Sequence, residues 1–158
     1  MSVGTTASRA SYGFPRSMRI IKSSDFAAVL TAKGRDVFRL KSGYFSATCL
    51  KRPSEGGSLR FGITVGKKFA PHATARVVVK RALRETARHQ APYLIALLCE
   101  TGVGLDVSLR LIKSIESFRA PYSGAHRDFR SAMRRDLLSL FAQITEHLEQ
   151  MRQAEAKE

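Results

Sequence analysis

The sequence predicts an α/β fold of the two-layer α+β type, in which a small mixed sheet of about four strands packs against a basic crossover helix and a C-terminal helix. Three observations predict it. Residues 59–65 and 105–112 alternate apolar and polar side chains, as half-buried strands do. Residues 73–89, between them, have the three- and four-residue spacing of a helix, which completes a strand–helix–strand unit. Residues 128–151 place their apolar side chains on one side of a long helix.

The N-terminal half predicts a short helix followed by two strands. Two serines precede Asp25, and either can cap a helix in which Phe26 and Leu30 share one face. Residues 37–50 are rich in the aromatic and β-branched residues that strands favour. Residues 53–58 contain paired glycines and predict a turn before the next strand.

Proline is expected to divide the helical region that follows Ala73. Pro92 has no backbone N–H and its ring collides with the preceding turn, so it is expected to end the first helix. Residues 93–99 then form a short second helix. Gly102 and Gly104 separate that helix from the strand at 105–112.

The length of 158 residues predicts one domain, and 44% hydrophobic residues are enough for a core. We expect a disordered extension over residues 1–13, a single domain over 14–149 and a frayed tail over 150–158. The extension has no apolar middle segment, so it is not a secretory signal. With two cysteines 50 residues apart, Cys49 and Cys99, the chain is not a disulfide scaffold.

Positive charge is concentrated in the first part of the chain. The 27 basic and 13 acidic residues give a formal charge of +14. Residues 60–88 contain eight basic side chains and one acid, Glu85, whereas residues 89–158 contain equal numbers of the two. Such clustering is typical of a surface that binds a phosphate backbone. A membrane surface is the less favoured partner, because no long basic helix carries a bulky apolar face.

The helix at 73–89 has one cationic side. Successive helix residues rotate by about 100°, which places Arg76, Lys80, Arg84, Arg88 and Arg81 within an arc of about 140°. Like charges four residues apart repel each other, so folding gains nothing from this arrangement, whereas a phosphate ligand does. One apolar residue, Val77, falls inside the cationic arc.

The stretch 60–88, RFGITVGKKFAPHATARVVVKRALRETAR, resembles the protein subunit of bacterial ribonuclease P. The matching residues are Gly62, Thr64, Val65, Lys67, Lys68, Arg76, Lys80, Arg81, Arg84, Glu85 and Arg88. A weaker match in FPRSMRIIKSSDFAAVL is carried by Phe14, Pro15, Arg16, Arg19, Asp25 and Phe26. The resemblance covers residues 14–145. Val77 and Val78 stand where the family has an asparagine and a second arginine.

The resemblance implies a ribonucleoprotein endonuclease that removes the 5′ leader of precursor tRNA. In that family the RNA subunit performs the hydrolysis with Mg²⁺, so the protein is expected to have no catalytic residue and no metal site of its own. The implied partners are the ribonuclease P catalytic RNA and precursor tRNA, with no membrane, no obligate protein partner and a cytoplasmic location. The family fold has a left-handed strand–helix–strand crossover, opposite to the general rule.

Two groups of site residues follow from the resemblance. The RNA-binding group is Lys67, Lys68, Arg76, Lys80, Arg81, Arg84 and Arg88. The second group lines a cleft between the first helix and the sheet, which holds the single-stranded leader. Because bases stack on aromatic rings near cations, the cleft candidates are Arg19, Phe26, Tyr44 and Phe45. Packing in the core is an equal alternative for Phe26 and Phe45.

No protein-based catalytic site is evident in the sequence. None of the four histidines has a partner at a metal-ligand spacing, and no phosphate-binding loop or dinucleotide fingerprint is present. A general RNA-binding module, ribosome-associated or chaperone-like, is therefore the alternative function, and the two valines fit it. A DNA-binding protein ranks last, because no second helix lies at helix-turn-helix spacing.

Overall fold

The computed structural model describes residues 15–53, 57–115 and 124–156. Their elements are a 3₁₀ helix η1 (Arg16–Met18), helices α2 (Ser23–Thr31), α3 (Ala73–Thr101) and α4 (Gly124–Ala156), and strands β1 (Val37–Ser42), β2 (Phe45–Pro53), β3 (Leu59–Thr64) and β4 (Val103–Leu111). The predicted order of helix, two strands, strand, helix, strand and helix is confirmed. No helix in these segments is both long and apolar enough to cross a membrane.

The four strands form one mixed sheet in the order β1-β2-β4-β3. β1 and β2 form an antiparallel hairpin, and β2 pairs antiparallel with β4 from Phe45↔Leu111 to Pro53↔Val103. β3 and β4 are parallel neighbours joined by α3, which confirms the predicted strand–helix–strand unit. The left-handed sense of this crossover stays an expectation of the resemblance.

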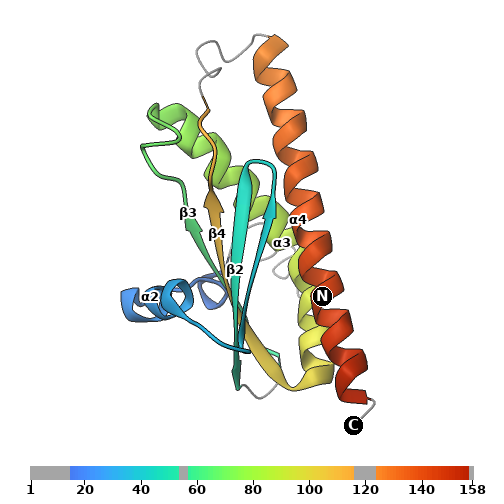
Figure 1. Ribbon diagram of the computed structural model, residues 1–158. Coiled ribbons are helices and arrows are strands. Elements are labelled where there is room, and N and C mark those ends of the chain that lie inside the picture. Colours follow the sequence, from blue (N-terminus) through green and yellow to red (C-terminus); the bar gives the residue numbers. More distant parts are fainter. Residues whose placement is uncertain (1–14, 54–56, 116–123, 157–158) are drawn as a thin grey trace, which may run out of the picture.

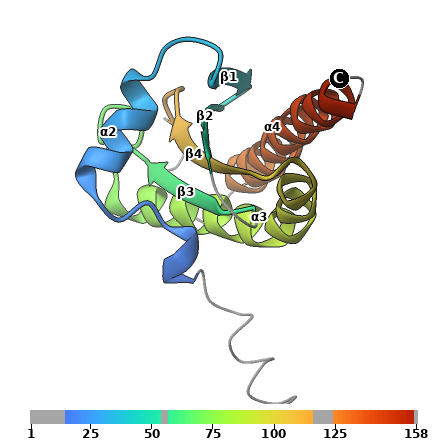
Figure 2. The ribbon, with the colours of Figure 1, turned by 90° about the horizontal axis from the view of Figure 1, so that it is seen from below.

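The helices cover the two faces of the sheet unequally. Figure 1 shows the long α4 running beside the sheet with α3 behind it, and the view from below in Figure 2 places α2 on the other side. We call the side of α3 and α4 the core face and the side of α2 the polar face. Strand residues alternate between the two faces, so the register decides which side chains lie in the core.

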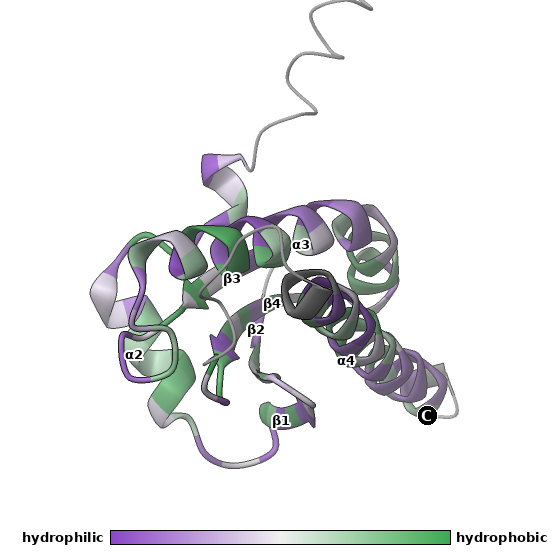
Figure 3. Cartoon of the chain, turned by 90° about the horizontal axis from the view of Figure 1, so that it is seen from above, coloured by the Kyte–Doolittle hydropathy of each residue, from purple (hydrophilic) through white to green (hydrophobic). Residues whose placement is uncertain are grey.

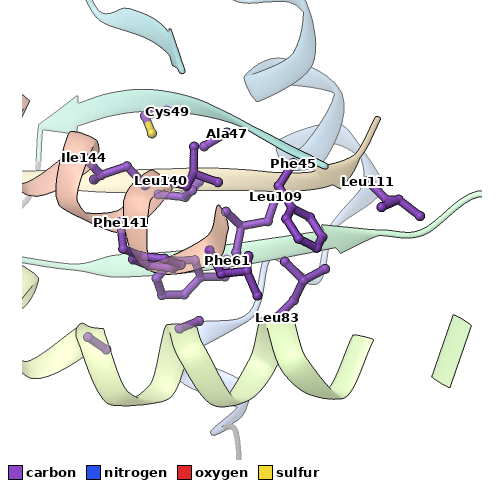
Figure 4. Close-up of a cluster of buried hydrophobic side chains, with 14 of the residues drawn as sticks. Phe45, Ala47, Cys49, Phe61, Leu83, Leu109, Leu111, Leu140, Phe141 and Ile144 are labelled. Carbon is purple, nitrogen blue, oxygen red and sulfur yellow. The ribbon is translucent and has the colours of Figure 1, made fainter. Parts of the chain in front are cut away.

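The hydrophobic core lies between the core face and the two long helices. Figure 4 shows how side chains from three strands, α3 and α4 meet there. Phe45, Phe61 and Phe141 are buried, and the rings of Phe61 and Phe141 lie 6.0 Å apart. Cys49 is also buried among these apolar groups, which raises the pKa of its thiol.

Helix α3 corrects the expectation that Pro92 ends a helix. The helix is continuous over 29 residues, with Pro92 inside it. In Figure 2 its first part lies across the view and its last part is seen end-on, so the helix bends along its length. A proline that removes one hydrogen bond bends a helix without ending it when both halves are packed. Leu83 before Pro92 and Leu94 after it are fully buried.

The C-terminal end of α3 is fixed by a cap and by contacts with α4. Gly102 adopts a left-handed φ of 70° and donates its N–H to the carbonyl of Leu98 at 2.9 Å. Tyr93 donates a hydrogen bond to Glu149, and Arg152 forms an ion pair with Glu100, both at 2.8 Å. Helix α4 continues to Ala156, beyond the end expected near residue 151.

Candidate nucleic-acid interface

The cationic side of α3 faces away from the core, as the helical spacing predicts. Ala75, Val79, Leu83 and Ala87 are buried against the sheet. On the other side, Arg81 and Arg84 are exposed, while Lys80 and Arg88 are half-buried. This arrangement leaves a row of positive charge on a helix whose opposite side holds the core together.

Val77 lies within this cationic row and is 56% exposed. Its predicted position on the helix is therefore confirmed. Val78, the next residue, is half-buried and packs against the core. The two valines thus differ in environment, because only Val77 is mainly in contact with solvent.

Arg76 stabilises the loop before α3. Its Nη1 donates to the carbonyl oxygens of Ala70 and Pro71, both at 2.9 Å. The residue before the helix, His72, makes no side-chain cap, so these bonds help to fix the helix start. The predicted RNA contact of Arg76 stays a prediction, and the structure adds this local role.

The paired lysines lie in the loop between β3 and α3. Lys67 and Lys68 are both exposed, and Lys68 Nζ lies 5.5 Å from the centre of the Phe69 ring. Ala70 donates its N–H to Gly66 at 3.0 Å, and Ile115 donates its N–H to Phe69 at 2.7 Å. The loop backbone is therefore fixed while its two ammonium groups reach solvent.

Helix α2 lies against the polar face through close packing at Gly62. A Cβ placed on Gly62 would lie 2.2 Å from Cε2 of Phe26, so only a hydrogen fits beneath the ring. Phe26 is half-buried and Val29, one turn later, is fully buried. Phe26 therefore packs where α2 meets the sheet, and its predicted role in binding the leader stays a prediction.

A buried carboxylate organises the polar face next to α2. Asp106 is 1% exposed, and it accepts two hydrogen bonds from Arg60, at 2.9 Å from Nε and 2.7 Å from Nη2. Arg52 Nε also lies 2.9 Å from Asp106, although not aligned for a hydrogen bond. Arg60 reaches Asp25 on α2 at 3.4 Å. The hydrogen bonds from Arg60 to Asp106 are the main reason that the pKa of Arg60 is raised.

Arg19 lies at the edge of the sheet. Residue 19 forms an isolated parallel bridge with Phe61, and the N–H of Ile20 donates to the Phe61 carbonyl at 3.0 Å. Its side chain is exposed. The structure therefore holds Arg19 beside β3, the strand that carries Gly62 under Phe26.

Two of the residues predicted for the cleft, Phe45 and Tyr44, lie elsewhere in the structure. Phe45 is 0% exposed on the core face, so its ring is out of reach of any base. Tyr44 packs edge-on against Phe129 of α4, with ring centres 5.4 Å apart, and its N–H donates to Asp136 of α4. Both predictions are wrong for the same physical reason: these rings lie on the α4 side of the sheet, and α2 lies on the other.

Polar strand residues were missed as candidates for the cleft. The register places Ser46 opposite Arg110, and it places Thr48 and Gly62 beside Ser108. Arg110 is exposed, whereas Ser108 is buried and its Oγ has no hydrogen-bond partner among the described residues. The signal was present in the polar positions that alternate with leucine in residues 105–112.

The described residues do not bring metal-ligating side chains together. No group of three or more histidine, cysteine, aspartate or glutamate residues lies close enough to hold an ion within 15–53, 57–115 and 124–156. His126 lies outside the residues whose side chains are described.

Comparison with known proteins identifies the family. The family model described as ribonuclease P matches residues 14–137. The ribonuclease P protein component of Thioalkalivibrio sulfidiphilus is 34% identical over 115 residues, covering 70% of this chain and 91% of that protein. That of Ralstonia pickettii is 30% identical over 137 residues, covering 87% and 86%. The solved RNase P protein from Thermotoga maritima shares the fold, with a TM-score of 0.50 and 23% identity over 78% of this chain and 94% of that one. The chain therefore belongs to the ribonuclease P protein family.

Proposed function

We propose that this protein is the protein subunit of ribonuclease P, which binds the catalytic RNA and the 5′ leader of precursor tRNA and promotes endonucleolytic removal of the leader. The observation that carries the proposal is the presence of two different surfaces on opposite faces of one sheet. The cationic side of α3 lies on the core-face side, and the polar face beside α2 lies on the other (Figure 2). One protein can thus contact two RNA segments at once.

The basic side of α3 supplies affinity for the catalytic RNA. Exposed arginines and lysines release condensed counterions when they contact phosphates, and this contribution does not depend on base sequence. Arg81 and Arg84 are the most accessible members of the row. Lys67 and Lys68 extend the positive charge from the start of α3 toward the end of β3.

The polar face beside α2 supplies the contacts to the leader. Phe26 offers a partly exposed ring for stacking, and Arg110 offers a cation on the neighbouring strand surface. Arg19 contributes a second cation at the sheet edge. Stacking together with phosphate contacts binds single strands of many sequences, which suits a leader that differs from one tRNA to another.

The hydrolysis itself is assigned to the RNA subunit with Mg²⁺. Two carboxylates beside the proposed cleft, Asp25 and Asp106, each form an ion pair with Arg60. Such engaged carboxylates serve to position α2 and β3. A cytoplasmic location follows from the proposed substrate, because precursor tRNA is processed where it is made.

The test is cleavage of a leader-bearing precursor tRNA by a bacterial ribonuclease P RNA at low Mg²⁺, with and without the protein. We expect a large rise in rate with the protein. Tight RNA binding without any rise would contradict the proposal and favour the general RNA-binding module. Two exposed arginines provide matched variants: Arg84→Glu is expected to weaken binding of the RNA subunit, and Arg110→Glu to reduce the preference for precursor over mature tRNA.

A further inference from the structure

A groove of about 690 Å³ lies between α3 and α4. Arg81 and His89 of α3 and Arg130 and Arg134 of α4 line its sides. Apolar residues of both helices, among them Val78, Ala82, Met133 and Leu137, also line it. Both helices cover the core face, so the sheet separates this groove from the polar face beside α2 (Figures 1 and 2).

Three arginines face this groove without an intramolecular partner in the described structure. Arg81, Arg130 and Arg134 are exposed, and none has a hydrogen bond or ion pair with another described residue. Glu85 is the only carboxylate among the lining residues. Arg130 and Arg134 are four residues apart on one helix, where like charges repel, so the pair weakens the helix slightly when nothing binds it.

The same two helices are joined differently at their other ends. There, Arg152 of α4 pairs with Glu100 of α3, and Tyr93 donates to Glu149. The chain therefore uses complementary groups where α3 and α4 hold each other, and cations on both helices where the groove lies. Figure 3 shows hydrophilic residues along the outer sides of both helices. This contrast indicates that an external anion binds between α3 and α4 at the end where the groove lies.

We infer that this groove binds the phosphodiester backbone of the ribonuclease P RNA subunit, with Arg130 and Arg134 making α4 a second RNA-contacting helix. The inference rests on the proposed function and extends it to a helix outside the basic motif. Arg81 belongs both to the row on α3 and to the groove, so the two surfaces are continuous. The leader is not the expected occupant, because its proposed cleft lies across the sheet. Leu138, 46% exposed in the groove, offers an apolar contact to a ribose.

The experiment measures binding of bacterial ribonuclease P RNA to the full-length protein over a range of salt concentrations. The decisive pair is Arg134→Ala and Arg135→Ala, because both arginines are exposed neighbours on α4 and only Arg134 lines the groove. The double variant Arg130→Ala/Arg134→Ala gives the magnitude. The slope of log affinity against log salt is negative, and each lost phosphate contact to a duplex reduces its magnitude by about 0.9. The affinity of the wild type rises when salt is lowered from about 200 to about 50 mM. The corresponding rise for the double variant is expected to be smaller by a factor of about 12.

The outcomes separate this inference from the proposed function. An unchanged salt slope in the double variant, or equal effects of Arg134→Ala and Arg135→Ala, would overturn the inference while the wild type still stimulates cleavage. A wild type that fails to bind the RNA subunit would overturn the proposed function instead. A weakened affinity for precursor tRNA alone, with binding of the RNA subunit unchanged, would also overturn the assignment of the occupant. Thermal unfolding of each variant is measured as the control for an intact fold.

Discussion

The contact between Gly62 and Phe26 gives a sharp prediction. A methyl group added at Gly62 is expected to destabilise the protein when the Phe26 ring is present, and not when the ring is absent. In Gly62→Ala the new Cβ would lie 2.2 Å from Cε2 of Phe26. Carbon atoms prefer about 3.5–4.0 Å, so the ring has to retreat by about 1.3–1.8 Å. Overpacking of this kind costs about 1–3 kcal/mol. Alanine also restricts the unfolded chain and returns about 0.4–1 kcal/mol, since the backbone of Gly62 is not in the left-handed region.

The net expectation is a loss of about 1–2 kcal/mol in the free energy of unfolding. The assay is urea unfolding of four proteins: wild type, Gly62→Ala, Phe26→Ala and the double variant. With the ring absent, the three nearest obstacles to the Cβ are gone, so Gly62→Ala in the Phe26→Ala background is expected to be neutral or stabilising. The same cost in both backgrounds would show that Phe26 does not pack on Gly62, and the proposed cleft would lose its wall.

Three further predictions concern other parts of the structure. Asp106→Asn is expected to lower the free energy of unfolding by about 2–3 kcal/mol. This loss is smaller than for a fully buried ion pair, because the two arginines beside Asp106 reach solvent. A loss below about 0.5 kcal/mol in urea unfolding would contradict the prediction. Burial and the charge of Lys51 lower the pKa of His147 below its usual 6.5. Its contribution to stability is therefore present above pH 6.5 and lost as the pH falls, because the unfolded state takes up the proton first. His147→Phe, which keeps a ring stacked on Phe38, should remove this part of the pH dependence of unfolding, and an unaltered profile would refute the assignment. Val77→Asn is expected to change stability by less than about 0.5 kcal/mol and to raise cleavage of precursor tRNA at low Mg²⁺, so an unchanged rate would make the position neutral.

The elements could be predicted from periodicity, because each depends on side-chain patterns along a continuous segment. The cationic side of α3 and the exposed position of Val77 follow directly from helical geometry. The course of the chain at Pro92 could not be predicted in this way. Burial of apolar side chains on both sides of the proline outweighs one missing hydrogen bond, and that burial is a tertiary effect.

The faces of the sheet could not be assigned from the sequence. Alternation shows that Phe45 and Ser46 point in opposite directions, but not which of the two directions meets α2. An aromatic residue therefore had equal grounds for core or cleft, and for Phe45 the core is correct. The groove between α3 and α4 could not be predicted from the sequence either, because its arginines come together only when two helices that are distant in the sequence pack against each other.

The position of β4 has a consequence for how the protein is made on the ribosome. β4 lies between β2 and β3, yet it is synthesised after both and after α3. Until Leu111 has emerged, the hairpin and β3 each have an unpaired edge, which favours association between nascent chains. The cationic helix emerges earlier, before the sheet that orders it is complete. Premature release before Val103 therefore yields a basic fragment with unpaired strand edges, translation through β4 joins the hairpin and β3 into one sheet, and the core is completed only when α4 follows.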